Sequence, residues 1–155
     1  MIKVLFVCLG NICRSPMAEA IFRKLVEEEG LHDQISVDSA GIGHWHIGSV
    51  PHEGTRKVLD AHTVSYEGLA ARQVKPEDWD EYDYLIAMDE KNIQDLQAIR
   101  EKNEVVVQKL MDYVENPVES EVPDPYFSGN FDYVYELVQA GCEGLLESIK
   151  KNHQL

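Results

Sequence analysis

The chain has 155 residues, with 14 basic and 28 acidic side chains and a formal net charge of −14. This length gives room for one domain, residues 1–155, whose core is large enough to fold without a disulfide or a metal. The excess negative charge argues against nucleic acid or an anionic membrane as a partner, so an anionic ligand would need a local concentration of positive potential.

The cysteines and the N-terminal residues bear on the compartment. Three cysteines cannot all pair, so we expect free thiols and a reducing cytoplasm. The apolar run at the N-terminus has roughly five residues, whereas a secretory signal needs at least about seven. No stretch approaches the ~18 apolar residues of a membrane span. We therefore expect a cytoplasmic protein that is not inserted in a membrane. We also expect a monomer, although the sequence does not reveal the oligomeric state.

The first predicted elements are a strand and a helix. Ile2 to Val7 is a continuous run of mostly β-branched or large apolar residues, which is typical of a strand buried on both faces of a parallel sheet. The helix is predicted to have Ser15 as its N-cap and Pro16 at its first position, and to end at Gly30. Apolar residues recur along it every four positions, and Glu19 falls on the opposite, polar face.

Strands and helices continue to alternate along the chain. We predict further strands over residues 35–39, 82–88 and 105–107, and further helices over residues 51–62, 89–99 and 130–150. This alternation predicts an α/β fold, a single three-layer domain whose four-stranded parallel sheet has right-handed crossovers and helices on both faces.

The segment VCLGNICRSP, residues 7–16, joins the first strand to the first helix. Ligands bind at the carboxyl ends of parallel strands, and a loop that enters a helix offers unpaired N–H groups to an anion. Gly10 and Asn11 adopt left-handed backbone angles readily, and Arg14 carries a planar fork of donors that matches two phosphate oxygens. The sequence therefore predicts a phosphate-binding loop after strand 1, composed of Leu9, Gly10, Asn11, Ile12, Cys13, Arg14 and Ser15.

Cys8 is predicted to lie at the floor of this loop. The N–H groups, the helix N-terminus and Arg14 favour a thiolate there, and Ser15 can donate a hydrogen bond to the sulfur. A thiolate beneath a bound phosphate is a nucleophile aimed at phosphorus. A cysteine that ends a buried strand is, taken alone, more often a packing residue. The neighbouring Gly10, Asn11, Arg14 and Ser15 favour the catalytic interpretation.

The chain resembles the low-molecular-weight protein tyrosine phosphatases, in particular their small bacterial members. Its loop has the family signature, which is Cys, five residues, Arg, and then Ser or Thr, placed near the N-terminus. The resemblance extends over nearly the whole chain, in the matching segments SPMAEAIFRKL at 15–25, DSAG at 38–41, WHIG at 45–48, ARQV at 71–74, AMDEKN at 87–92 and PDPYF at 123–127. The resemblance implies a metal-independent enzyme without a cofactor, which hydrolyses a phosphotyrosine protein or an aryl phosphate and releases inorganic phosphate.

The reaction also needs an acid, because a tyrosine leaves slowly as a phenolate whose conjugate acid has a pKa of about 10. The sequence has 28 carboxylates, and periodicity does not choose among them. The D-P-Y motif of the family implies that Asp124 protonates the leaving group and then activates water against the phosphocysteine on Cys8. Pro123 and Pro125 stiffen the loop that carries Asp124. Without the resemblance, this segment would be interpreted as an exposed turn.

Several supporting residues carry over from the family. Asn11 and Ser39, together with Ser15, match positions whose hydrogen bonds hold the loop in its strained form. Asp89 matches a residue that orients the loop arginine, although it is also a plausible helix N-cap on composition alone. Trp45 and Tyr126 resemble the aromatic walls that hold a phenyl ring, and core packing is an equally good interpretation of Trp45.

Three segments depart from the family pattern. Many members have D-P-Y-Y where this chain has Phe127 as the last residue. Animal members have a histidine just before the A-R-Q stretch, where this chain has residues 68–71, GLAA, so the support of the loop there must differ. Ile12 is a threonine in the related bacterial arginine phosphatases, and isoleucine favours phosphotyrosine.

Other functions use a similar loop. A protein-arginine phosphatase is one alternative. An arsenate reductase is another, but it needs further cysteines to relay a disulfide, and this chain has none between Cys13 and Cys142. Cys142 lies on the apolar stripe of the last helix, where we expect it to pack. A non-catalytic phosphate-binding or redox-sensing module is the third alternative. The histidines of residues 44–52 lack the framework of a metal site, so we expect them to be solvated.

Cys13 has two interpretations. It is five residues from Cys8 on a loop that curls around one phosphate, so a disulfide between the two could stop the oxidation of Cys8 at a reversible stage. The family resemblance points the same way. Alternatively, Cys13 packs as a small apolar residue beneath the loop.

Overall fold

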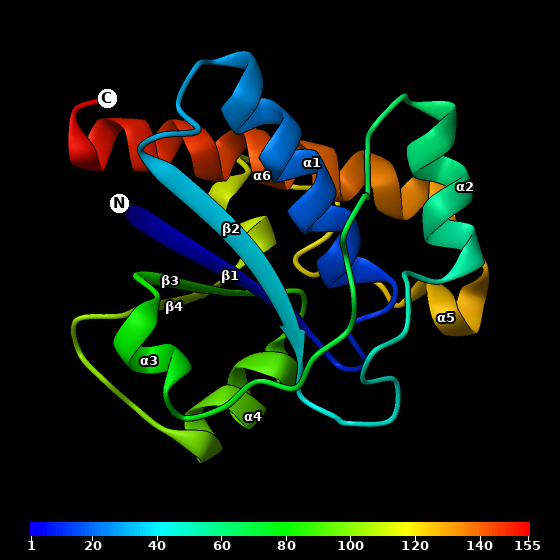
Figure 1. The fold of residues 1–155 in the computed structure, drawn as a ribbon, viewed down its shortest axis with the longest axis horizontal. Helices are drawn as coiled ribbons and strands as arrows, with labels where there is room; N and C mark the ends of the chain where they lie inside the picture. Colours follow the sequence, from blue (N-terminus) through cyan, green and yellow to red (C-terminus); the bar gives the residue numbers. More distant parts are fainter.

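The computed structural model describes all residues, 1–155, and contains one parallel sheet. Its strand order is β2-β1-β3-β4, with bounds β1 (Ile2–Cys8), β2 (Ile35–Gly41), β3 (Tyr84–Ala87) and β4 (Val106–Lys109). The central strand β1 pairs with β2 on one side and β3 on the other (Figure 1). The connections therefore change direction at β1, and its carboxyl end is the switch point at which ligands bind in such sheets.

Helices cover both faces of the sheet, as predicted (Figure 1). One face carries α1 (Arg14–Glu28), α2 (Glu53–Ala61) and α6 (Phe131–His153), and the other carries α3 (Asp78–Glu81) and α4 (Glu90–Ile99). Two short helices, η1 (Leu110–Tyr113) and α5 (Pro125–Ser128), lie in the connection between β4 and α6. The predicted three-layer α/β fold is confirmed.

Strand β1 has a continuous apolar run because helices cover both faces of the sheet. Val4 and Phe6 point into the larger core with α1 and α6, whereas Leu5 and Val7 point into the smaller core with Trp79 of α3. All of these side chains are fully or almost fully buried. Successive residues of a strand face opposite sides of the sheet, so a strand covered on both sides needs no polar positions.

Two predicted helix starts are wrong. Helix α1 begins at Arg14 with Cys13 as its N-cap residue, and no side chain caps it. Ser15 lies inside the helix because its hydroxyl bonds Cys8 and Asn11 instead of the helix end. Helix α2 begins at Glu53, two residues later than predicted, and the ring of its N-cap, His52, accepts the N–H of Gly54.

The remaining boundaries differ by a few residues. Strand β2 runs two residues beyond the predicted end, β3 is shorter than residues 82–88, β4 covers 106–109, and α6 extends to His153. The single-turn helices α3, η1 and α5 were not predicted, since four residues carry too little periodicity. None of the helices combines the length and hydrophobicity that a bilayer span requires.

Candidate active site

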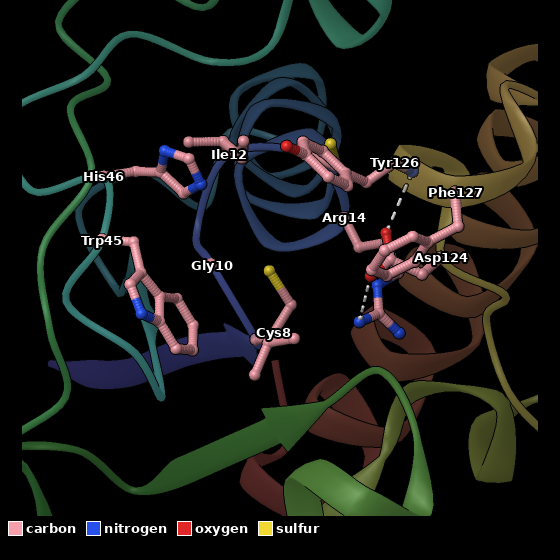
Figure 2. Close-up of a pocket in the computed structure, with 11 residues that line it drawn as sticks. Cys8, Gly10, Ile12, Arg14, Trp45, His46, Asp124, Tyr126 and Phe127 are labelled. Atoms are coloured by element: carbon pink, nitrogen blue, oxygen red, sulfur yellow. Dashed lines mark hydrogen bonds and ion pairs between the residues drawn. The ribbon is translucent and has the colours of Figure 1, made fainter.

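A cleft of about 180 Å³ opens at the carboxyl end of β1. Cys8 lies at its floor, with Trp45 and His46 on one side and Tyr126 and Asp124 on the other (Figure 2). The residues after Cys8 form the loop that leads into α1. The predicted phosphate-binding loop therefore lines a cleft at the switch point of the sheet.

The backbone of this loop is rich in free donors. The N–H of Asn11 points at Cys8 Sγ, 3.3 Å away. The other N–H groups of the loop donate to no acceptor within the protein; they belong to Leu9, Gly10, Ile12, Cys13, Arg14 and Ser15. A curved row of unpaired N–H groups that ends at a helix N-terminus is the arrangement that binds phosphate.

Asn11 and Gly10 shape the loop in different ways. Asn11 has φ of 57°, the left-handed conformation that asparagine tolerates better than most residues. Gly10, for which we also expected a left-handed angle, has none. Its missing side chain serves a different purpose, because a Cβ there would meet the ring of His46 at 3.2 Å.

The sulfur of Cys8 is buried and surrounded by donors. Ser15 Oγ lies 3.0 Å from the sulfur, and the backbone N–H of Asn11 donates to it at 3.3 Å. The helix α1 begins directly behind the loop, so its positive end faces the sulfur. Each of these groups stabilises a negative charge on Cys8.

A hydrogen-bond network behind the loop joins residues that are far apart in sequence. Asn11 Nδ2 donates to Ser15 Oγ at 2.8 Å and to Ser39 Oγ at 2.9 Å, as expected for the supporting residues. Two further members were not predicted. Asn11 Oδ1 accepts the backbone N–H of Arg72 at 3.0 Å, and Ser39 Oγ donates to Glu19 Oε1 at 2.6 Å. Glu19 is buried, so its placement on the polar face of the helix was wrong.

Arg14 is held by carboxylates while its guanidinium lines the cleft. Its side chain is 3% exposed, and Nη1 donates to Asp89 Oδ2 at 2.7 Å and to the carbonyl of Val122 at 3.0 Å. Burial alone would lower the pKa of Arg14, but the negative charges of Cys8, Asp89 and Asp124 raise it. Asp89 also accepts the N–H of Asn92 as the N-cap of α4, so it contacts the loop arginine and caps a helix at the same time.

Asp124 lies at the edge of the cleft, immediately before the short helix α5. Its Oδ1 accepts the N–H of Tyr126 at 3.1 Å, which makes it the N-cap of α5, and Pro125 occupies the first helical position. Its Oδ2 lies 3.4 Å from Arg14 Nη2 (Figure 2). The segment is therefore a capped helical turn, and the capping bond holds the carboxylate beside the loop.

Trp45 and Tyr126 line the cleft as opposed walls. Trp45 is 63% exposed, so the alternative of core packing is wrong. Two further residues of the wall were not predicted, His46 and Phe127. His46 packs against Gly10 and is thus not simply a solvated side chain.

The three cysteines are free and buried. Cys13 lines the cleft and packs against Ile12 and Ala71. Burial, and after it the charges of Cys8 and Asp124, raise the pKa of the Cys13 thiol to about 12. Cys142 lies in the main core, which confirms its packing role. No group of three or more His, Cys, Asp or Glu side chains is arranged to hold a metal ion.

The chain is similar to known low molecular weight phosphatases along its whole length. The model of the family "Low molecular weight phosphotyrosine protein phosphatase" matches residues 3–155. The low molecular weight protein-tyrosine-phosphatase YfkJ of Bacillus subtilis is 55% identical over all of both chains, and its crystal structure superposes with a TM-score of 0.95, covering 98% of this chain and 96% of that chain.

Two more distant relatives extend the comparison. The low molecular weight protein-tyrosine-phosphatase PtpA of Staphylococcus epidermidis is 44% identical over all of this chain and 98% of its own. The crystal structure of a Drosophila arginine phosphatase is 34% identical, with a TM-score of 0.88 over 96% of this chain and 98% of that one. With the family model matching almost every residue, the chain belongs to the low molecular weight phosphotyrosine protein phosphatase family.

Proposed function

We propose that this protein is a cytoplasmic, metal-independent phosphatase that hydrolyses phosphotyrosine through a phosphocysteine on Cys8. The observation that carries the proposal is the row of free loop N–H groups around the buried sulfur, with Arg14 beside it. These donors match the three equatorial oxygens of a phosphoryl group and supply fixed electrostatic stabilisation without a metal. A reducing compartment would keep the three thiols free.

In the first step, the thiolate of Cys8 attacks phosphorus and the bond from phosphorus to the tyrosine oxygen breaks. Asp124 gives its proton to the leaving oxygen, so tyrosine departs as a neutral phenol. Arg14 and the loop N–H groups hold the equatorial oxygens throughout. A positioned acid is worth about 10²–10⁴ in rate, and Asp124 is anchored beside Arg14 by its bond to Tyr126.

In the second step, water attacks the phosphocysteine and the phosphorus–sulfur bond breaks. Asp124, now a carboxylate, takes a proton from the water, and inorganic phosphate leaves. The departing thiolate recovers its hydrogen bonds from Ser15 and Asn11. Stabilising this thiolate lowers the barrier to the step, because the sulfur is the leaving group.

The cleft walls support an aryl substrate. Trp45 and Tyr126 face each other across the cleft and offer ring faces to a phenyl group. A protein-arginine phosphatase remains the second candidate, since such an enzyme is among the structural relatives. Ile12 argues against it, because an apolar side chain in the cleft gives a guanidinium no polar partner. The burial of Cys142 in the main core argues against an arsenate reductase.

Turnover of p-nitrophenyl phosphate by the purified protein, with a chelator present, is the direct test. The proposal predicts hydrolysis that is insensitive to the chelator and is followed by release of phosphate from phosphotyrosine peptides. A protein that binds phosphate yet turns over neither substrate would be a phosphate-binding module, and the proposed function would be wrong.

A further inference from the structure

Glu19 is a buried carboxyl group without an ion pair. Its residue is 7% exposed, and its one hydrogen bond is the 2.6 Å contact with Ser39 Oγ. The nearby cations are bound elsewhere. Arg23 donates to the carbonyls of Ser65 and Glu67, and Arg72 pairs with Asp38 and Asp78. An unpaired buried carboxyl is costly, and here it stands at the end of the network that reaches Cys8.

The direction of each hydrogen bond in that network follows from one backbone group. The N–H of Arg72 can only donate, so the oxygen of the Asn11 amide must face it. The Asn11 NH₂ group therefore faces the hydroxyls of Ser15 and Ser39, at 2.8 Å and 2.9 Å. Both hydroxyls accept from Asn11, and each must direct its own proton to another acceptor.

Each hydroxyl has one such acceptor. Ser39 directs its proton to Glu19, and Ser15 directs its proton to Cys8 Sγ at 3.0 Å. A carboxylate that accepts the Ser39 proton increases the electron density on Ser39 Oγ and so strengthens its bond from Asn11, since chained hydrogen bonds polarise one another. The state of Glu19 is thereby linked to the orientation of Asn11 and Ser15.

We propose that Glu19 is a positioning residue, whose carboxylate holds Ser39 as an acceptor for Asn11 and thereby keeps the Asn11 amide and the Ser15 hydroxyl oriented toward Cys8. The inference rests on the proposed function in one respect, that Ser15 assists the departure of the Cys8 thiolate. Glu19 touches neither the cleft nor the sulfur.

The surroundings of Glu19 predict that its charge changes near neutral pH. Burial is the largest influence and raises the pKa to about 7; the Ser39 bond opposes it, as do Arg23 of α1 and Arg72 of the segment before α3, while Asp38 of β2 adds to it. Below pH 7 the carboxyl is protonated and accepts more weakly from Ser39. The contribution of Glu19 should therefore grow as the pH rises.

The kinetic test compares kcat of wild type and Glu19→Gln on p-nitrophenyl phosphate across the pH range. The ratio of the wild-type kcat to the Glu19→Gln kcat should be near one at about pH 5.5 and rise to about tenfold at pH 8, with KM little changed. The reason is that the thiolate of the variant leaves with a weaker hydrogen bond. Ser39→Ala should lower kcat at every pH, because it removes the acceptor for Asn11, and by more as the pH rises; adding Glu19→Gln to it should cause no further loss. Glu28→Gln, an exposed position on the same helix, controls for helix charge and should match wild type at every pH.

A ratio that does not vary with pH, or losses from Glu19→Gln and Ser39→Ala that simply add, would overturn the proposal. If Glu19→Gln does not fold, the pH profile of Ser39→Ala decides in its place. A second measurement is independent of turnover. The side-chain amide resonances of Asn11 should titrate with a midpoint near pH 7 in wild type and should not titrate in Glu19→Gln. Inactive wild type would refute the proposed function alone, whereas an Asn11 amide without this titration would refute the role of Glu19.

Discussion

Arg14 and Asp124 meet at the edge of the cleft although they are 110 residues apart in sequence, with Arg14 Nη2 lying 3.4 Å from Asp124 Oδ2. The same guanidinium is held through Nη1 by Asp89 and by the carbonyl of Val122, so Nη2 is the nitrogen that contacts Asp124. A phosphoryl group bound by the loop and Arg14 would thus have a carboxyl group beside its leaving oxygen.

This relationship predicts that Asp124→Asn depends on the leaving group. The variant should lower kcat by about 10²–10⁴ on phosphotyrosine, whose phenol needs the proton, and much less on an aryl phosphate with a low-pKa phenol. Steady-state kinetics on a series of aryl phosphates would measure this. Equal losses along the series would mean that Asp124 acts only by holding Arg14 or the α5 turn.

Removing the nucleophile should separate catalysis from binding. Cys8→Ser should have no measurable turnover, because a hydroxyl in this site is a far weaker nucleophile than a thiolate. The loop N–H groups and Arg14 remain, so the variant should still bind phosphate, which titration calorimetry can measure. Substantial phosphatase activity in this variant would contradict the phosphocysteine mechanism.

The apolar character of Ile12 predicts the substrate class. Wild type should have a much higher kcat/KM on phosphotyrosine than on phosphoarginine, because Trp45 and Tyr126 flank the cleft and Ile12 offers no polar contact to a guanidinium. Measuring both substrates under one set of conditions decides the question. A preference for phosphoarginine would reassign the enzyme to the arginine phosphatases.

Cys13 is predicted to protect Cys8 from irreversible oxidation. After treatment with peroxide and then dithiothreitol, wild type should recover activity, Cys13→Ser should recover much less, and peptide mapping should show a link between Cys8 and Cys13. The raised pKa of Cys13, about 12, keeps it a thiol at neutral pH, so the link should form faster in alkaline buffer. Equal recovery without a link would leave Cys13 as a packing residue.

The buried Glu19 predicts that stability decreases as the pH rises. Its pKa is raised from an ordinary value of 4.5 to about 7 by burial. Between these values the folded protein holds the proton more tightly than the unfolded chain, so the free energy of unfolding falls across this range and levels off above about pH 7.

The expected loss is on the order of 3 kcal/mol. Urea unfolding of wild type and Glu19→Gln should give similar stabilities at about pH 4.5, and the variant should be increasingly the more stable of the two up to about pH 8. Stability differences that stay constant with pH would show that Glu19 keeps its ordinary pKa in the folded protein.

The sequence by itself determined the parallel α/β architecture and the phosphate-binding loop. Each depends on residues that are consecutive in the sequence. The apolar run of residues 2–7 indicates a strand that is buried on both faces of the sheet. The residues from Cys8 to Ser15 place a sulfur, turn-forming residues and a guanidinium in one consecutive segment. The resemblance to the family supplied what periodicity did not, which was the choice of Asp124 among 28 carboxylates.

The tertiary structure decided which polar side chains join the loop. The sequence predicts Ser15 as a helix cap, but its hydroxyl forms hydrogen bonds with the Cys8 sulfur and the Asn11 amide instead. Glu19 falls on the polar face of α1 by spacing, yet it is buried where its carboxylate reaches Ser39 on β2. Such contacts join residues from separate elements, and helical period reports only which side of a helix is apolar, not which polar residue another strand will cover.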